Sequence, residues 1–235
     1  SRSCRCRAPI TRRTEMTGTP ALQRLLTWLS PAFPVGGFAW SQGLETAIGD
    51  GRIEAAPDLK DWLAGVLAHG GMRTEAILLA HAHRCHSDAG QLAELADLCF
   101  ALTPARERHA EAALTGDAFA IAARAWPSDV FARLPQPCPY AVAVGAIAAA
   151  QGIGLHDILL GYLTTAVHTQ ISVAVRLVPL GQTAGLQVMA GLEADVAALA
   201  DAAASANLDD IGGIAYAADI AQMRHETLEP RIFRS

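Results

Sequence analysis

Hydrophobic residues recur at intervals of three and four positions along most of this chain. That spacing is typical of amphipathic α-helices, whereas the β-branched runs typical of strands are scarce. Glycine and proline clusters divide the pattern into segments of helical length. The pattern therefore predicts an all-α fold, a single-domain bundle of about eight to ten helices that share one core.

The longest unbroken segment begins at Leu155 and ends before Pro179 and Gly181. Apolar residues occupy most of its faces, so it predicts a buried central helix over about residues 155–178. Its polar residues argue against a membrane span, which needs about 20 mostly apolar residues. One face of this helix carries small, hydroxyl and basic residues, namely Gly161, Thr165, His168, Thr169, Ser172 and Arg176. We expect that face to be a close helix–helix contact, with a subunit interface or an internal polar channel as the alternative.

Further helices are expected on both sides of the central one. The periodic segments before it cover residues 22–29, 38–48, 57–70, 72–87, 91–102, 104–125 and 140–151. Those after it cover residues 184–206 and a last helix that begins at Asp209 or Asp210 and ends near residue 224. Thr103 and Pro104 are expected to start their helix as cap and first residue. The small residues at 140–151 favour close packing against the central helix.

The helix at 104–125 has a charged side and an apolar side. We expect its early charged residues to be exposed, namely Arg106, Glu107, Arg108 and Glu111. We expect its later apolar residues to face the core, namely Leu114, Ala118, Ile121 and Ala122.

The composition narrows the class of protein. The 235 residues suffice for one domain with a sizeable core. The formal net charge of -5 gives no electrostatic footprint for nucleic acid, and we expect no membrane partner. Five scattered cysteines favour the reducing cytoplasm. Residues 1–15 hold five arginines and no apolar run, which predicts a disordered or non-native extension before a domain at 16–235.

Two further stretches are candidates for docking rather than for core. The corner at residues 30–45 contains two prolines and two adjacent glycines, which predicts a rigid, shaped loop. The tail at about residues 225–235 holds arginines on either side of Ile232 and Phe233. Arginine and phenylalanine are enriched in protein interfaces, so the tail is a candidate docking segment, with a frayed terminus as the alternative.

A metal site is a weaker possibility. His81, His83, Cys85 and His86 lie close together at the end of one predicted helix. The spacing places His81 with Cys85 on one face and His83 with His86 on another, and either pair suits zinc or nickel. No carboxylate completes either pair, so surface histidines are the simpler interpretation.

The chain offers no recognisable catalytic motif. The nucleophile elbow G-x-S-x-G, the zinc-protease motif H-E-x-x-H and the phosphate-binding loop are all absent from the sequence. An interaction protein is therefore favoured over an enzyme. The remaining alternatives are a metal-binding chaperone that uses the histidine cluster, and an enzyme whose site is lined by the polar face of the central helix.

Three segments in order resemble the urease accessory protein UreF family. The first is L-x-x-L-S-P-A-F-P-V-G-G-F-A-W-S-Q-G-L-E, from Leu26 to Glu45. The second is A-V-R-L-V-P-L-G-Q-T, from Ala174 to Thr183, and the third is H-E-T-L-E-P-R-I-F-R-S, which ends at Ser235. Each is moderately specific, and the order and spacing of all three are highly specific.

The resemblance implies an all-α homodimer with a non-enzymatic role in urease maturation. Such proteins bridge UreD (also called UreH), which contacts apo-urease, and the nickel-carrying GTPase UreG. They are thought to regulate GTP hydrolysis and to aid nickel delivery, so no cofactor is expected to be bound stably and GTP belongs to the partner. We expect Glu45, Arg176 and Gln182 near the GTPase-facing or tunnel side. The tail residues expected to bind UreD are His225, Arg231, Phe233 and Arg234.

Overall fold

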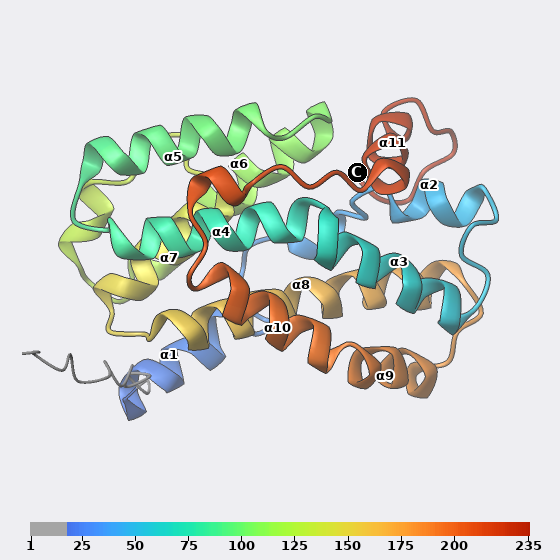
Figure 1. Cartoon of the computed structure of the whole chain (residues 1–235), viewed down its shortest axis with the longest axis horizontal. Coiled ribbons are helices and arrows are strands. Elements are labelled where there is room, and N and C mark those ends of the chain that lie inside the picture. Colours follow the sequence, from blue (N-terminus) through green and yellow to red (C-terminus); the bar gives the residue numbers. More distant parts are fainter. Residues whose placement is uncertain (1–17) are drawn as a thin grey trace, which may run out of the picture.

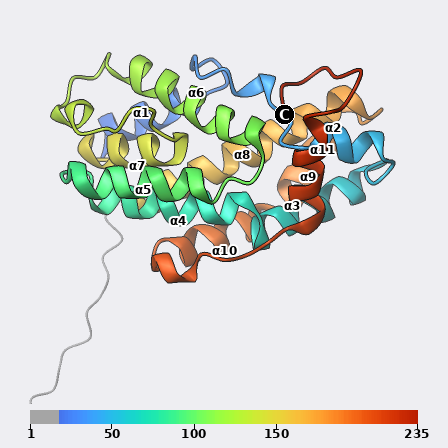
Figure 2. The ribbon, with the colours of Figure 1, turned by 90° about the horizontal axis from the view of Figure 1, so that it is seen from above.

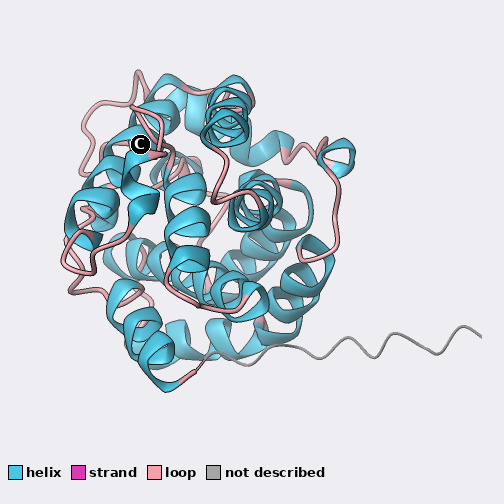
Figure 3. Cartoon of the chain, turned by 90° about the vertical axis from the view of Figure 1, so that its left-hand side faces the viewer, coloured by secondary structure: helices cyan, strands magenta, loops and turns pink. Residues whose placement is uncertain are grey.

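Eleven α-helices and three short 3-10 turns form the regular structure of residues 18–235, which the computed structural model describes. These residues contain no strand, so the all-α prediction is confirmed (Figure 3). The first helices are α1 (Thr19–Trp28), α2 (Leu44–Gly49), α3 (Ala56–His69), α4 (Gly71–Arg84), α5 (Ala89–Ala101) and α6 (Arg106–Ala123). They are followed by α7 (Tyr140–Ala150), α8 (Leu155–Leu177), α9 (Gln182–Gly191), α10 (Glu193–Ala203) and α11 (Tyr216–His225). The 3-10 turns are η1 (Gly37–Ala39), η2 (Asp129–Ala132) and η3 (Leu208–Asp210).

Helix α8 is the predicted central helix. It begins after Gly154 and ends before Pro179, and it packs against α2, α4, α9 and α10 (Figure 1). Asp157 in its first turn and Arg176 in its last turn complement the helix dipole. By length and composition α8 could cross a membrane, but half of its most apolar window is buried inside the protein. The core helix of a soluble protein has the same properties, so this finding fits the predicted buried helix.

Helix α7 packs against α4 and α6, with only a small contact to α8. A Cβ atom at Gly145 would overlap the Leu79 carbonyl oxygen of α4, so only glycine allows this approach. Likewise, a Cβ atom at Gly116 of α6 would overlap the Cys138 carbonyl oxygen just before α7. The prediction of close packing was correct, but the predicted neighbour, α8, was wrong. Small residues predict that another helix packs closely, but they do not indicate which helix it is.

The predicted orientation of α6 was wrong. Arg108 and Glu111, expected at the surface, are buried, whereas Leu114 and Ile121 are 55% and 68% exposed. The two charged residues share the buried face with Ala112, Thr115, Gly116, Phe119 and Ala123. Arg108 and Glu111 pair with each other on this face. The side of α6 that faces the core therefore could not be identified from the positions of its polar residues. The helix also begins at Arg106 rather than Pro104, because the hydroxyl of Thr103 donates to the Cys99 carbonyl instead of capping it.

Three other predicted helices have different limits. The expected helix at 184–206 is two helices, α9 and α10, which meet at Leu192. The last helix begins at Tyr216, because the Asp210 carboxylate instead accepts the backbone N–H of Asn207 in η3. The expected helix at 38–48 is only α2, because the two residues before Leu44 have positive φ angles. The predicted extension at 1–15 lies outside the described residues.

Candidate partner-binding site

The C-terminal tail folds back onto the corner that precedes α2. The Arg234 N–H donates to the Ala39 carbonyl at 2.8 Å, and the Ser41 N–H donates to the Ser235 carbonyl at 2.6 Å. The Ser41 hydroxyl also donates to the Ser235 carbonyl. Figure 2 shows the chain end beside α2 and α11. The tail is therefore an ordered part of the surface rather than a frayed terminus.

The corner is shaped to receive the tail and α11. Gln42 and Gly43 have positive φ angles of 55° and 79°, which turn the chain sharply into α2. A Cβ atom at Gly43 would lie 2.6 Å from the backbone nitrogen of Gln222 in α11. Glycine therefore satisfies both the turn and the close approach of α11. The first and third segments of the UreF resemblance thus meet in space.

Glu45 is the central acceptor of this contact. Its carboxylate accepts the Ile232 N–H at 2.7 Å, the Phe233 N–H at 3.0 Å and the His225 Nε2 at 3.0 Å. Burial acts to raise the pKa of Glu45, but the hydrogen bonds from His225, Ile232 and Phe233 outweigh it and lower that pKa. The charged form of Glu45 therefore stabilises the docked tail.

His225 lies between two carboxylates. Its ring is fully buried, with Nε2 facing Glu45 and Nδ1 2.8 Å from Glu107 of α6. Arg231 forms an ion pair with the other oxygen of Glu107. Phe233 is buried at 5% exposure, whereas its neighbour Ile232 is 78% exposed. The docked tail thus inserts one apolar side chain and presents another.

Five of the seven predicted partner-binding residues therefore belong to one cluster. These are Glu45, His225, Arg231, Phe233 and Arg234, and the guanidinium of Arg234 lies 5.7 Å from the centre of the Trp40 ring. Glu45, which was expected near the GTPase-facing or tunnel side, accepts a hydrogen bond from Ile232 of the tail. The sequence did not show that contact, because 180 residues separate Glu45 from His225.

Arg176 and Gln182 line a separate groove between α8 and α9, together with His168 and Ser172. The Arg176 guanidinium lies 5.8 Å from the centre of the Phe38 ring in the corner. In residues 18–235, no carboxylate forms an ion pair with Arg176. The groove therefore contains a positive charge that no carboxylate of residues 18–235 pairs with. The protein as a whole has a negative net charge.

The N-terminal half of the polar face of α8 contacts the end of α1 and the corner. A Cβ atom at Gly161 would lie 2.6 Å from a methyl group of Leu29, and the Thr165 hydroxyl donates to the Leu29 carbonyl at 3.4 Å. The predicted close contact is thus present at Gly161. Further along, Thr165, His168 and Thr169 line a groove of about 470 Å³ against the corner.

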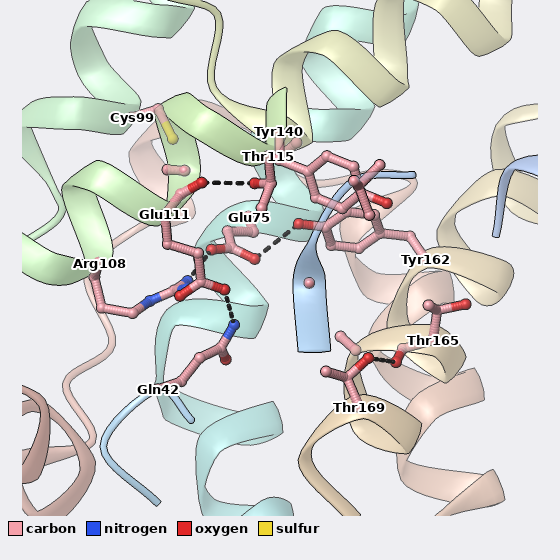
Figure 4. Close-up of a pocket in the computed structure, with 15 residues that line it drawn as sticks. Gln42, Glu75, Cys99, Arg108, Glu111, Thr115, Tyr140, Tyr162, Thr165 and Thr169 are labelled. Carbon is pink, nitrogen blue, oxygen red and sulfur yellow. Dashed lines mark hydrogen bonds and ion pairs between the residues drawn. The ribbon is translucent and has the colours of Figure 1, made fainter. Parts of the chain in front are cut away.

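A buried ion cluster next to this groove was not predicted from the sequence. Arg108 donates to Glu75 of α4 at 2.6 Å and pairs with Glu111 on its own helix (Figure 4). The hydroxyl of Tyr162 in α8 donates to Glu75, and the amide of Gln42 donates to Glu111, both at 2.8 Å. These groups line a cavity of about 90 Å³. The i, i+3 pair Arg108–Glu111 was the one local signal, because the other partners are far apart in sequence.

Charge pairing outweighs burial in this cluster. Burial acts to lower the pKa of the Arg108 guanidinium, but Glu111 and Glu75 raise it well above its usual range. Burial and the neighbouring Glu75 also raise the pKa of Tyr162. Arg108 is therefore always charged, and Tyr162 is always a neutral donor. The Ser235 hydroxyl reaches Glu111 at 3.3 Å, which joins the tail to the cluster.

Three histidines of the candidate metal cluster contact backbone carbonyls. His81 Nε2 lies 3.1 Å from the Ala206 carbonyl, and His83 Nε2 lies 2.8 Å from the Ile153 carbonyl. His86 Nδ1 lies 3.1 Å from the carbonyl of His83. Burial lowers the pKa of His81 and of His83, and it raises the pKa of the Cys85 thiol. Among the described residues, no three potential ligands gather in one place.

Comparison with known proteins agrees with the three resembling segments. A sequence model of the UreF family matches residues 53–193. A urease accessory protein UreF of Rhizobium etli is 48% identical over 223 residues, which cover 94% of this chain and all of that protein. The UreF proteins of Mesorhizobium japonicum and Agrobacterium fabrum are 45% and 46% identical, over 94% and 93% of this chain and 100% and 98% of their own. The chain therefore belongs to the UreF family of urease accessory proteins, which support urease maturation.

Proposed function

We propose that this protein bridges UreD (UreH), bound to apo-urease, and the GTPase UreG, and that it aids the delivery of nickel to urease. The observation that carries this proposal is the meeting of the first and third family segments in one docked surface, while the second segment supplies the separate Arg176 groove. Two surfaces of different chemistry are what a bridging protein needs. Nickel is cargo in this scheme, and GTP is bound by UreG.

The tail is the proposed UreD-binding surface. Ile232 is exposed on it, and Arg231 and Arg234 remain available at its edges. An exposed aliphatic side chain between two arginines is a typical centre for a protein interface. The buried side chains of Phe233 and His225 then hold the tail in the conformation that exposes Ile232.

The Arg176 groove is the proposed UreG-facing side. Arg176 has no carboxylate partner among residues 18–235, and Gln182 lines the same groove. A carboxylate of the GTPase partner would complete this pairing through charge-assisted hydrogen bonds. Glu45 contributes through the corner, because the same corner carries Phe38 beside Arg176 and Ala39 beneath the tail.

The remaining features of the proposal follow from the family. Membership of an accessory-protein family implies a non-catalytic role. We propose a homodimer that works in the cytoplasm without a stably bound cofactor, and that influences GTP hydrolysis by UreG. A metal-binding chaperone is the weaker candidate, because no three potential metal ligands gather in one place among residues 18–235.

Co-purification with UreD tests the tail directly. The double variant Arg231→Ala, Phe233→Ala should reduce the amount of UreD retained by this protein, whereas Arg176→Ala should leave it unchanged. Circular dichroism of each variant confirms that the fold is intact. UreD retained at wild-type levels by the folded double variant would refute the assignment of the tail.

A further inference from the structure

We propose that His225 is a protonation-dependent clasp, which holds the tail when its imidazole is charged and loosens it when the pH rises. The clasp is a property of how this chain holds its own tail, so it does not rest on the proposed function. Its basis is the position of one fully buried ring between two carboxylates from different helices.

The geometry requires two protons on the ring. Nε2 lies 3.0 Å from Glu45 of α2, and Nδ1 lies 2.8 Å from Glu107 of α6. A carboxylate can only accept, so each nitrogen must donate, and an imidazole donates from both nitrogens only as the imidazolium. If the ring loses one proton, a nitrogen lone pair faces a carboxylate at hydrogen-bond distance inside the protein. That contact changes from attractive to repulsive.

Charged groups approach the ring from three elements. Glu45 comes from α2 and Glu107 from α6, while Arg231 of the tail pairs with the outer oxygen of Glu107. On α11 itself, Arg224 pairs with Asp50, and Glu226 beside its end pairs with Arg106, away from the ring. Across residues 18–235, no other charged side chain forms an ion pair with His225. The two carboxylates carry two negative charges, and the Arg231 guanidinium supplies one positive charge. A positive charge on the His225 ring balances the other.

The clasp acts on the tail through Glu45. The same carboxylate that faces Nε2 also accepts the N–H groups of Ile232 and Phe233. His225 therefore fixes the position and the ionised state of the acceptor on which the tail depends. It is a positioning residue, since it acts on Ile232 and Phe233 through Glu45.

The sign of the pH dependence follows from each group. Docking should weaken as the pH rises, because a ring that carries only one proton cannot donate to both carboxylates. Docking should also weaken in acid, as the pH falls through the lowered pKa of Glu45 and that acceptor becomes neutral. The tail should therefore be held most firmly between these two limits.

Hydrogen exchange of the full chain tests the clasp. The protection of the Ile232 and Phe233 amides, corrected for intrinsic exchange, should fall about tenfold or more between about pH 6 and pH 9, because hydrogen bonds to charged groups are roughly twice as strong as neutral ones. In the variant Glu107→Gln the fall should disappear, because a neutral ring can donate to Glu45 and accept from the new amide. Removing the exposed pair His156–Asp201 by His156→Gln should leave the wild-type curve unchanged.

Two further results keep the test decisive. Arg231→Gln removes the other ion pair at Glu107 but keeps the clasp, so protection should be lower at every pH with the same dependence on pH. Constant protection of the wild-type tail over this range would overturn the clasp. A Glu107→Gln variant that loses protection in the same way as the wild type would also overturn it.

Discussion

Replacing Arg108 by methionine should destabilise the fold more than any exposed substitution on α6. Arg108 is buried between Glu75 and Glu111, with side-chain exposures of 10%, 21% and 9%. Methionine keeps much of the volume but leaves two carboxylates without their cation. Removing one partner of a buried ion pair costs about 3–5 kcal/mol, since the remaining charge is left uncompensated. We therefore expect the free energy of unfolding to fall by that amount.

Urea unfolding at neutral pH, followed by circular dichroism, measures this loss. Arg106→Met is the matched control, because Arg106 lies at the start of the same helix with a side chain 80% exposed, and its loss should change stability by less than about 0.5 kcal/mol. The triple variant Glu75→Gln, Arg108→Met, Glu111→Gln carries no stranded charge and should be more stable than Arg108→Met alone. A loss below about 1 kcal/mol in Arg108→Met would refute the reasoning, given the magnitude expected for a buried pair. So would a triple variant as unstable as the single one.

Three other predictions address packing, partner choice and pH. Gly145→Ala should lower stability by about 1–3 kcal/mol, because its Cβ would overlap the Leu79 carbonyl oxygen. The control is Gly65→Ala in α3, whose Cβ would meet nothing within 4 Å and which should stabilise the protein by about 0.4–1 kcal/mol. Thermal unfolding of both variants measures the difference. The double variant Arg176→Ala, Gln182→Ala should weaken UreG binding in pull-down assays while UreD is retained; equal loss of both partners would contradict two separate surfaces. Glu45→Gln should flatten the acid side of the stability curve, since the lowered pKa of Glu45 makes its contribution fall as the pH falls; an unchanged acid limb would show that Glu45 does not contribute.

The elements with an unambiguous pattern could be predicted from the sequence. Helix α8 is apolar on most faces and is bounded by Gly154 and Pro179, so its limits were predicted closely. Pro57 correctly marked the first turn of α3. In both cases the residues that start and stop the helix are local, and the helix needs no particular partner to be recognised.

The sequence did not predict which face of a helix is buried when that face is paired with side chains from distant parts of the chain. α6 buries Arg108 and Glu111 because Glu75 and Gln42 meet them from distant parts of the chain. Leu114, on the opposite face, is left exposed. Periodicity identifies a helix and its two faces, but it cannot tell which face is inner when the polar face is neutralised by charges that arrive through the fold.

The candidate site shows the same division. The arginines and phenylalanine of the tail are residue types that by themselves indicate a docking segment, and the prolines and glycines of the corner indicate a rigid, shaped loop. Their mutual contact through Glu45 and His225 was not predictable, because nothing local relates α2 to the end of α11. Only the fold shows that the two segments form one surface.

Size-exclusion chromatography with light scattering, on this protein mixed with UreD and UreG, tests the bridging role most directly. Full-length protein would be compared with a version that ends at His225 and with the Arg176→Ala variant. We predict one co-eluting complex of all three proteins, loss of UreD on truncation, and loss of UreG in the Arg176 variant. Folded protein that elutes free of both partners would contradict the account.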